Sequence, residues 1–232
     1  MATPTLPPRQ LTARRTTIAM KMAMAVSGAL FVFYVLLHMY GNLKLFGGQS
    51  AYDVYAEHLR TLGEPILPYS GFLWLFRALL VIALLAHAYS AFYLWSRAQG
   101  ARTTRYAVKK AAVRTISSRF MRWGGVALLL FLVFHLLQFT TNTIQVNGSH
   151  DSPYQRVVAG FQVWWVVVVY VLAMIALGMH LRHGVWSASQ TLGWTGTARA
   201  RTYANAVAVT IAAVVVTGFL LPPLSILFGL IK

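Results

Sequence analysis

Four histidines lie inside long apolar stretches of this chain, one in each stretch. They are His38, His87, His135 and His180. Ionisable rings are costly inside a membrane and usually mark a functional site. Two imidazoles that face each other across a helix bundle offer neutral nitrogen ligands, which suits the two axial positions of a haem iron. Histidines that only hydrogen-bond between helices are the alternative, but four of them, one per stretch, favour cofactor ligation.

The composition indicates that these histidines lie in a membrane. Of the 232 residues, 58% are hydrophobic and 10% are charged, whereas a soluble domain carries roughly 25% charged residues. The chain has 20 Lys and Arg against 4 Asp and Glu. This excess does not indicate nucleic-acid binding, because the basic residues lie between long apolar runs without a basic-aromatic motif. The chain has no cysteine, so it cannot by itself hold an iron–sulfur cluster through thiolates.

Five apolar runs are long enough to cross a bilayer, which takes about 20 helical residues. We expect one all-α membrane domain over residues 1–232, built as a five-helix bundle behind a cytoplasmic arm at residues 1–20. The predicted transmembrane helices are about 21–43, 71–96, 123–143, 157–181 and 203–231.

The segments between these helices have their own patterns. Residues 51–63 predict a short interfacial helix before a turn at Pro65–Pro68. Residues 182–202 predict a polar connection, and Pro222–Pro223 predict a bend in the last helix.

Loop charges predict the orientation of the bundle. With the N-terminus in the cytoplasm and the C-terminus outside, 15 of the 20 basic residues fall on the inner side. All four acids, Asp53, Glu57, Glu64 and Asp151, fall on the outer side. Basic loops mark the cytoplasmic face of membrane proteins, so we expect this orientation.

This orientation gives each histidine a depth. His38 lies roughly 25 Å along the first helix from its inner end, and His135 lies 13 residues beyond Arg122, so both belong to the outer half. His87 precedes Arg97 by ten residues and His180 precedes Arg182 by two, so both belong to the inner half. The sequence therefore predicts an outer pair and an inner pair, each drawn from two helices.

Small or polar neighbours at helical spacing are expected to leave room for a macrocycle and to share the ligand faces. The small neighbours are Ala83, Ser90 and Ala91 near His87, Gly41 near His38, and Ala176 and Gly184 near His180. Ser27 and Tyr34 share the face of the first helix that carries His38. His183 lies three residues beyond His180 on the same face, so either can be the ligand; depth favours His180, because His183 follows Arg182 at the water interface.

Three stretches that contain these histidines resemble a known family. Residues 27–48, 77–106 and 180–194 are similar to the cytochrome b558-type membrane subunit of succinate dehydrogenase and fumarate reductase, respiratory complex II. The resemblance extends over the first four predicted helices, and the order and spacing of the histidines make it specific.

The resemblance implies a multi-pass subunit of a bacterial inner membrane that anchors a flavoprotein subunit and an iron–sulfur subunit on the cytoplasmic side. Succinate is oxidised on the flavoprotein, so this chain is not catalytic for succinate itself and passes electrons to quinone. Most such subunits hold two b haems, here with His87 and His180 as ligands of the inner haem and His38 and His135 as ligands of the outer one. The basic inner loops would be the docking surface, and the oligomeric state is left open.

The resemblance leaves the metal centre and the quinone site open. Some family members carry no haem, and His180 with His183 would permit a Rieske-type [2Fe–2S] cluster if the iron–sulfur subunit supplied two cysteines. The candidates for an inner quinone site are Ser27, Trp186, Ser187 and Gln190. The candidates for an outer one are Glu57, His58 and Glu64. Loop acids are usually only solvated and tryptophans often anchor helices at the interface.

Two other functions remain as alternatives. The first is a cytochrome b anchor for another quinone-linked dehydrogenase, such as a hydrogenase or formate dehydrogenase. The second is a small transporter, which would bind no metal. The sequence disfavours transport, because the apolar runs contain no acidic residue and no pair of broken helices.

Overall fold

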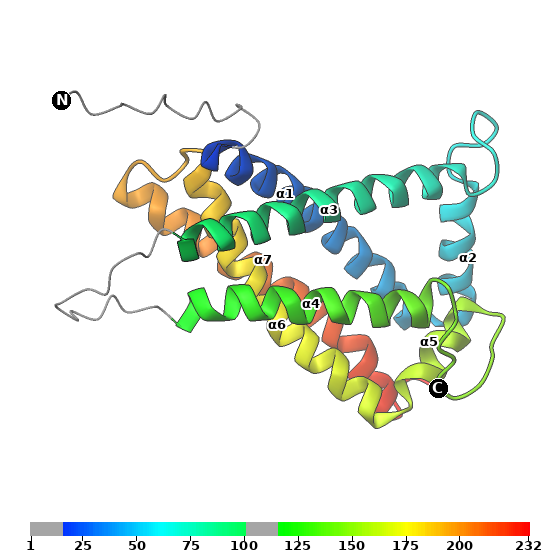
Figure 1. The fold of residues 1–232 in the computed structure, drawn as a ribbon. Helices are drawn as coiled ribbons and strands as arrows, with labels where there is room; N and C mark the ends of the chain where they lie inside the picture. Colours follow the sequence, from blue (N-terminus) through cyan, green and yellow to red (C-terminus); the bar gives the residue numbers. More distant parts are fainter. Residues whose placement is uncertain (1–15, 101–115) are drawn as a thin grey trace, which may run out of the picture.

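The chain is built from long helices. The computed structural model describes residues 16–100 and 116–232, and in these residues all regular structure is helical (Figure 1). Most of the predicted N-terminal arm and the centre of the predicted basic loop between Arg97 and Arg122 lie outside the described residues.

Within residues 16–100 and 116–232, five helices are long and apolar enough to cross a membrane, which agrees with the predicted number. The long helices are α1 (Thr17–Leu43), α3 (Gly71–Gly100), α4 (Ile116–Phe139), α6 (Trp164–Thr191) and α7 (Ala198–Leu227). The shorter elements are the 3₁₀ helix η2 (Lys44–Gly47) and the helices α2 (Gly48–Thr61) and α5 (Pro153–Phe161). The chain is therefore an all-α, multi-pass membrane protein, and α2 corresponds to the expected short helix after the first span.

Among the helix starts that the structure describes, three have hydroxyl N-caps. The side chain of Thr16 accepts a hydrogen bond from the amide of Ala19, and Thr197 accepts one from Ala200. Ser152 caps α5 in the same way by accepting from Gln155. Such caps satisfy amide groups that have no partner within the helix, so the polar residues just before the apolar runs fix where these helices start.

The fourth apolar run differs from the prediction of one helix at 157–181. Ser152 and Pro153 start the separate helix α5, and the extended backbone of Val163 (φ −92°, ψ 111°) separates it from α6. At its other end, α6 continues through Thr191, because Leu181 and Ser189 are buried against neighbouring elements. The predicted polar connection at 182–202 is thus wrong for its first ten residues.

The other predicted boundaries differ by a few residues. Relative to the predicted spans, α1, α4 and α7 begin earlier, α3 ends later, and α4 and α7 end earlier. Hydropathy marks where a segment is apolar, whereas capped helices extend past the apolar region into polar residues. Pro222 and Pro223 lie inside α7, as expected.

The five long helices alternate in direction, which gives the bundle two distinct ends (Figure 1). We call the end where α1, α4 and α7 begin and where α3 and α6 end the N-terminal end. We call the opposite end, where α2 and α5 lie, the α5 end. The strongest packing is between α6 and α7, between α1 and α3, and between α4 and α6, and α1 also contacts α6 and α7.

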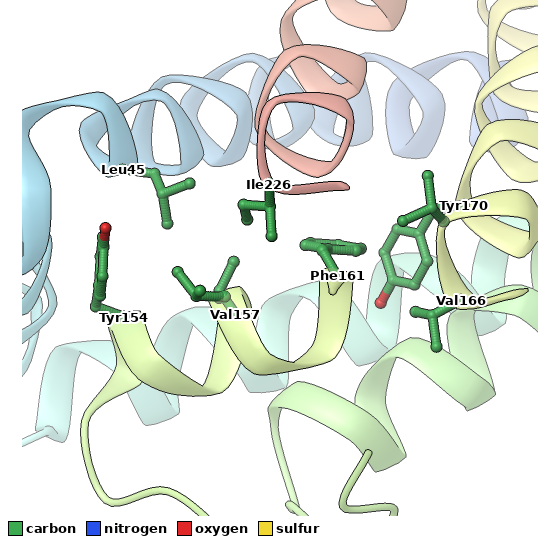
Figure 2. Close-up of a cluster of buried hydrophobic side chains, with 9 residues drawn as sticks. Leu45, Tyr154, Val157, Phe161, Val166, Tyr170 and Ile226 are labelled. Atoms are coloured by element: carbon green, nitrogen blue, oxygen red, sulfur yellow. The ribbon is translucent and has the colours of Figure 1, made fainter. Parts of the chain in front are cut away.

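The largest buried cluster lies at the α5 end. It joins residues of η2, α5, α6 and α7, and Figure 2 shows Leu45, Val157, Phe161, Tyr170 and Ile226 of this cluster. Leu45 is 1% exposed and Ile226 3%. Most of the short helix α5 is buried in this cluster, so α5 is a structural cap on the bundle rather than a continuation of α6.

Asp53 ties α2 to α5. Its carboxylate accepts a hydrogen bond from Ser152 Oγ at 2.6 Å and another from the Tyr154 amide at 3.0 Å. Gln49 Nε2 adds a third link by donating to Ser152 Oγ at 3.4 Å. One acid of the predicted outer loop therefore has a structural role, since it holds the N-terminus of α5 in place.

We expect Asp53→Ala to destabilise the α5 end. The change leaves the Tyr154 amide and Ser152 hydroxyl without their acceptor, and loss of a helix cap costs about 1 to 2 kcal/mol. For a chain of this size that corresponds to a melting temperature lower by about 2 to 8 °C. The measurement is thermal unfolding of the purified protein in detergent.

Asp151→Ala is the matched control. Asp151 is an exposed acid two residues before Pro153, and only its backbone carbonyl accepts a described hydrogen bond, from Arg156. This variant should unfold within about 1 °C of the wild type, because exposed substitutions of this kind cost little. Equal melting temperatures for the two variants would show that Asp53 is not a significant link.

Candidate functional site

The α5 half of the bundle contains the first histidine pair. His38 of α1 and His135 of α4 have ring centroids 5.8 Å apart with planes at 83°. Tyr34 stacks on His38 at 5.4 Å, and Phe219 of α7 lies 5.7 Å from the same ring. Tyr34 shares the His38 face of α1, as the spacing predicts. Phe131 of α4 and Tyr170 of α6 contact the His135 ring, so aromatic side chains of four helices surround these two imidazoles.

The second pair lies nearer the N-terminal end. His87 of α3 and His180 of α6 have ring centroids 6.1 Å apart with planes at 53°. Ser27 Oγ of α1 lies 3.1 Å from His87 Nδ1, and Phe31 packs edge-on to the His87 ring at 6.1 Å. The structure thus brings together the same two pairs that the sequence predicts, each formed by helices distant in the chain.

Two helices give the separation of the pairs independently. On α1, Ser27 contacts the second pair and His38 belongs to the first. These residues are 11 positions apart, or about 16 Å along the helix axis at 1.5 Å per residue. On α4, Gly125 contacts His180 and His135 lies ten positions on, or about 15 Å. The two pairs therefore stand on two levels that together span about half of a bilayer core.

The spacing within each pair suits two imidazoles that bind one metal from opposite sides. Metal–imidazole bonds are about 2 Å long and the ring centroid lies roughly 1 Å further, so the two centroids should be about 6 Å apart. The observed separations of 5.8 and 6.1 Å agree. In the described residues, no group of three His, Cys, Asp or Glu side chains gathers into a metal site. Each level therefore offers two protein nitrogens, the number that haem uses.

His180 has a further property of a ligand. Its Nδ1 is buried without a hydrogen-bond partner, and a buried polar atom without a partner is costly. A Cβ atom at Gly125 would lie 3.5 Å from His180 Cε1, and a Cβ atom at Gly28 would lie 3.4 Å from His87 Cε1. Both rings of this pair thus lie against glycines, where no side chain competes for the adjacent space. The residues present therefore fit an axially bound haem.

Two of the predicted small neighbours are glycines with different surroundings. A Cβ atom at Gly41 would lie 2.9 Å from Tyr55 Cε1, so Gly41 allows α2 to approach α1, and the macrocycle space expected there is wrong. A Cβ atom at Gly184 would meet nothing within 4 Å, so this position is open, as expected. Gly28 and Gly125 are the glycines that lie against the histidine rings.

His183 lies inside α6, not at the start of a polar connection. Depth does not distinguish His180 from His183 as strongly as the sequence predicts, because α6 continues for eight residues beyond His183. The ring contact with His87 distinguishes His180 from His183. His180 faces His87, and His183 is half-buried on the same helix beside Arg182.

Tyr170 and Gln138 are site residues that the sequence analysis missed. Tyr170 Oη lies 3.0 Å from His135 Nδ1 and donates a hydrogen bond to Gln138 Oε1 at 3.0 Å. Gln138 is 3% exposed. Its position three residues after His135 in an apolar helix was the available signal, because a buried amide in such a helix needs a partner.

The outer quinone candidates remain at the surface. Glu57, His58 and Glu64 are exposed. Glu57 accepts a hydrogen bond from Tyr69 Oη at 3.2 Å and pairs with Arg60 at 3.5 Å. The pKa of the Tyr69 phenol is raised, mainly by partial desolvation and to a smaller extent by the hydrogen bond to Glu57. In the described part of the chain, none of the three candidates has a contact with His38 or His135 among the hydrogen bonds and ring contacts.

Two inner candidates line a cleft at the N-terminal end. The cleft has a volume of about 330 Å³ and lies between the first turns of α1 and the last turns of α6. Its lining residues are Ile18, Lys21, Met24, Ser187, Gln190 and Thr191. Trp186 is not among them. Ser27 lies one turn beyond Met24, and its Oγ is within 3.3 Å of the Met24 carbonyl oxygen, so this hydroxyl stands between the cleft and His87.

One comparison with known proteins found a match. Residues 96–220 match a family model described as the succinate dehydrogenase/fumarate reductase transmembrane subunit. The matched region contains His135, His180 and His183, whereas His38 and His87 precede it. Neither the curated proteins nor the solved structures that were compared with the chain include a match.

We expect a cysteine at position 187 to be reached by small thiol reagents. The chain contains no native cysteine, so a single introduced thiol reports one position. Ser187 lines the cleft, whereas Ser189 on the same helix is 8% exposed and donates to the Val185 carbonyl. The measurement is the labelling rate of each variant with a small maleimide in detergent.

Ser189→Cys is the control, and Ser187→Cys should react faster by on the order of tenfold, because thiol reactivity follows exposure. Equal rates would mean that the cleft is closed in solution.

Proposed function

We propose a function that starts from the family, since this chain belongs to the succinate dehydrogenase/fumarate reductase transmembrane subunit family. The family model matches more than half of its 232 residues, which confirms the resemblance in the sequence. The proposed role is the membrane anchor and electron-transfer subunit of a succinate:quinone oxidoreductase. The observation that carries it is the pair of facing histidines at each of two levels in the bundle.

The proposed cofactors are two b haems. His87 and His180 would hold one, and His38 and His135 would hold the other. Haem, when bound, supplies one-electron transfer. The pair spacings of 6.1 and 5.8 Å support this assignment. A Rieske-type cluster on His180 and His183 is the weaker candidate, because the His180 ring lies beside the His87 ring of another helix.

The chain's own residues orient the ligands and exclude water. Ser27 holds the His87 ring through its hydroxyl, and Tyr170 holds His135. The aromatic rings of Tyr34, Phe131 and Phe219 pack directly on the pair at the α5 end. Apolar surroundings of this kind restrict solvent access and set the local dielectric, and both influence redox potential.

The N-terminal end is proposed to face the cytoplasm and to dock the flavoprotein and iron–sulfur subunits. The charge distribution along the sequence supports this orientation, since basic loops mark the inner side. Arg182, Arg199 and Arg201 are carried by α6 and α7 near this end. In this arrangement the chain is not catalytic for succinate, and the membrane is the inner membrane of a bacterium.

The proposed quinone site is the cleft at the N-terminal end. A quinone has an apolar body and two carbonyl oxygens that accept hydrogen bonds. Ile18 and Met24 offer apolar walls, and Lys21, Ser187 and Gln190 offer donors. Its closeness to Ser27, and through Ser27 to His87, supports the cleft over the exposed loop acids Glu57 and Glu64.

The test is a dithionite-reduced minus oxidised visible spectrum of the complex purified through a tag on this chain, together with haem and metal analysis. The proposal expects a b-type spectrum, two haems per chain, and a flavoprotein and an iron–sulfur subunit in the purified complex. A complex without haem but with iron and sulfide beyond the usual clusters of the partner would favour the histidine-ligated cluster. A metal-free chain would contradict the proposed electron path.

We expect His180→Ala to remove one haem, and His87→Ala to do the same. Each change removes one of the two histidines that would hold the haem at the level nearer the N-terminal end, so the haem content should fall by about half. Quinone reduction by succinate should be lost as well. The measurement is the pyridine haemochrome content of the purified complex, with the electron-transfer activity measured in parallel.

His183→Ala is the matched control, because it removes an imidazole from the same helix three residues further on. It should keep both haems. If His183→Ala loses a haem and His180→Ala does not, the ligand on α6 is His183.

We also expect Gly125→Leu to weaken the same haem. Because a Cβ atom at this position would already be 3.5 Å from His180 Cε1, a longer side chain must displace the ring or occupy the space beside it. Displacing a ligand in this way should weaken haem retention roughly tenfold, measured as haem loss to an excess of apomyoglobin.

Gly124→Leu provides the comparison, since a Cβ atom at Gly124 meets nothing within 4 Å. This neighbouring variant should retain haem as the wild type does. The same rate of loss from both variants would show that the His180 ring does not define the pocket.

A further inference from the structure

In the pair formed by His38 and His135, a hydroxyl group contacts Nδ1 of the His135 ring. Tyr170 Oη of α6 is 3.0 Å from His135 Nδ1 of α4. The same hydroxyl donates to Gln138 Oε1 at 3.0 Å. Tyr170 is 7% exposed and Gln138 is 3% exposed, so water does not compete with these bonds.

Counting protons gives the direction of the bond to the imidazole. A phenol has one proton, and Tyr170 donates it to Gln138 Oε1. The Tyr170 oxygen is therefore an acceptor toward His135, and the Nδ1 atom of His135 must carry the proton. A neutral imidazole protonated at Nδ1 has its lone pair at Nε2, which leaves Nε2 available as a ligand.

The packing around Tyr170 fixes this arrangement. The ring of Tyr170 lies 4.9 Å from Phe131 and 4.8 Å from Phe161, nearly perpendicular to both. Figure 2 shows Phe161 of α5 next to Tyr170. A Cβ atom at Gly160 would lie 3.0 Å from Gln138 Nε2. Helix α5 therefore also packs against the Gln138 amide, which accepts the hydrogen bond from Tyr170. The phenol thus has little freedom to turn away from His135.

We propose that Tyr170 is the positioning residue of His135: with its own proton held by Gln138, it fixes the Nδ1–H tautomer and directs Nε2 to the iron. Gln138 sets the direction of the bond, and α5 holds Gln138. The proposal rests on His135 being an iron ligand, as in the proposed function, and it adds the residues that determine how this ligand is presented.

The hydrogen bond has a measurable consequence for the haem at this level. An imidazole that donates its second proton to an acceptor is a more basic ligand, and a more basic ligand favours the ferric over the ferrous state. Loss of the acceptor should therefore raise the midpoint potential of this haem. Changes of outer partners typically produce effects of roughly tenfold, and a tenfold shift of a one-electron equilibrium is about 59 mV.

The experiment compares Tyr170→Phe with the wild type in the purified full complex. Haems are counted by pyridine haemochrome, and the two midpoint potentials are measured by spectroelectrochemical titration. The haem in question is the one that His135→Ala removes. We expect Tyr170→Phe to keep both haems, to raise the potential of that haem by about 59 mV, and to leave the other haem unchanged.

Tyr154→Phe is the matched control. Tyr154 is 8% exposed, lies in the same buried cluster, and donates its hydroxyl proton to the Lys232 carbonyl, away from the histidines. It loses the same atom and should move neither potential. Gln138→Met is a second variant that keeps Tyr170 but removes the acceptor of its hydroxyl proton, which makes the phenol oxygen a weaker acceptor for the His135 Nδ1–H. It should also raise the midpoint potential of the same haem. This variant replaces Tyr170→Phe in the experiment if Tyr170→Phe does not assemble into the complex.

The outcomes separate the inference from the function on which it rests. If Tyr170→Phe and Gln138→Met leave both potentials where Tyr154→Phe leaves them, the positioning role is wrong while His135 remains a ligand. If His135→Ala loses no haem, the ligand assignment in the proposed function is wrong, and the inference is overturned together with it. A rise in both potentials at once would indicate a general loosening of the bundle and would contradict a specific role for Tyr170.

Discussion

A buried imidazole needs partners for its two ring nitrogens, and most of this structure follows from that requirement. In an apolar bundle an unpaired polar atom is costly, so a histidine is tolerated only where neighbours supply the missing bond. His87 and His135 each have a hydroxyl at Nδ1, from Ser27 and Tyr170. Ser27 donates its own proton to the Ala23 carbonyl, as Tyr170 donates its proton to Gln138. In each pair, one ring is therefore held by a hydrogen bond at Nδ1, and its Nε2 atom is left for another partner.

The helices provide the rigid frame for these bonds. Each pair joins one helix of the α1 and α3 unit to one helix of the α4 and α6 unit. Because helix rise is fixed at about 1.5 Å per residue, the 11 residues from Ser27 to His38 and the ten from Gly125 to His135 impose nearly the same separation on both sides. Two levels of ligands therefore follow from register alone. A shift of α1 by a single turn would separate His38 from His135 and Ser27 from His87, so it would disturb both levels. A shift of α6 would likewise displace His180 from His87 and Tyr170 from His135.

The sequence was sufficient to predict the two histidine pairs, but not the residues that hold them in place. His38, His87, His135 and His180 are conspicuous because each is a rare polar residue in an apolar run, and charge in the loops sorted them by depth. The bond between Tyr170 and Gln138 joins residues 32 positions apart, and no local pattern connects them. The separation of α5 from α6 was also hidden, since residues 157–181 are mostly apolar on both sides of the break. The start of α5 is fixed by Asp53, about a hundred positions earlier. Gly41 was misassigned because a glycine near a ligand is equally suited to close helix approach, here by Tyr55.

The two histidine pairs differ in their surroundings: one is covered by buried side chains, and the other lies near a cleft. At the α5 end, Phe139 and Tyr170 pack on the His135 ring. Tyr170 belongs to the buried cluster that also contains residues of α5 (Figure 2), and the bonds behind the His135 ring are internal to the fold. Near the N-terminal end, the cleft between α1 and α6 comes within one helical turn of Ser27, the residue that holds His87. The cleft thus lies on the side of the second pair, whereas aromatic side chains surround the first. Under the proposed function, exchange with quinone belongs at the level of His87, and the covered level depends on Tyr170 and Gln138 because solvent cannot satisfy its imidazoles.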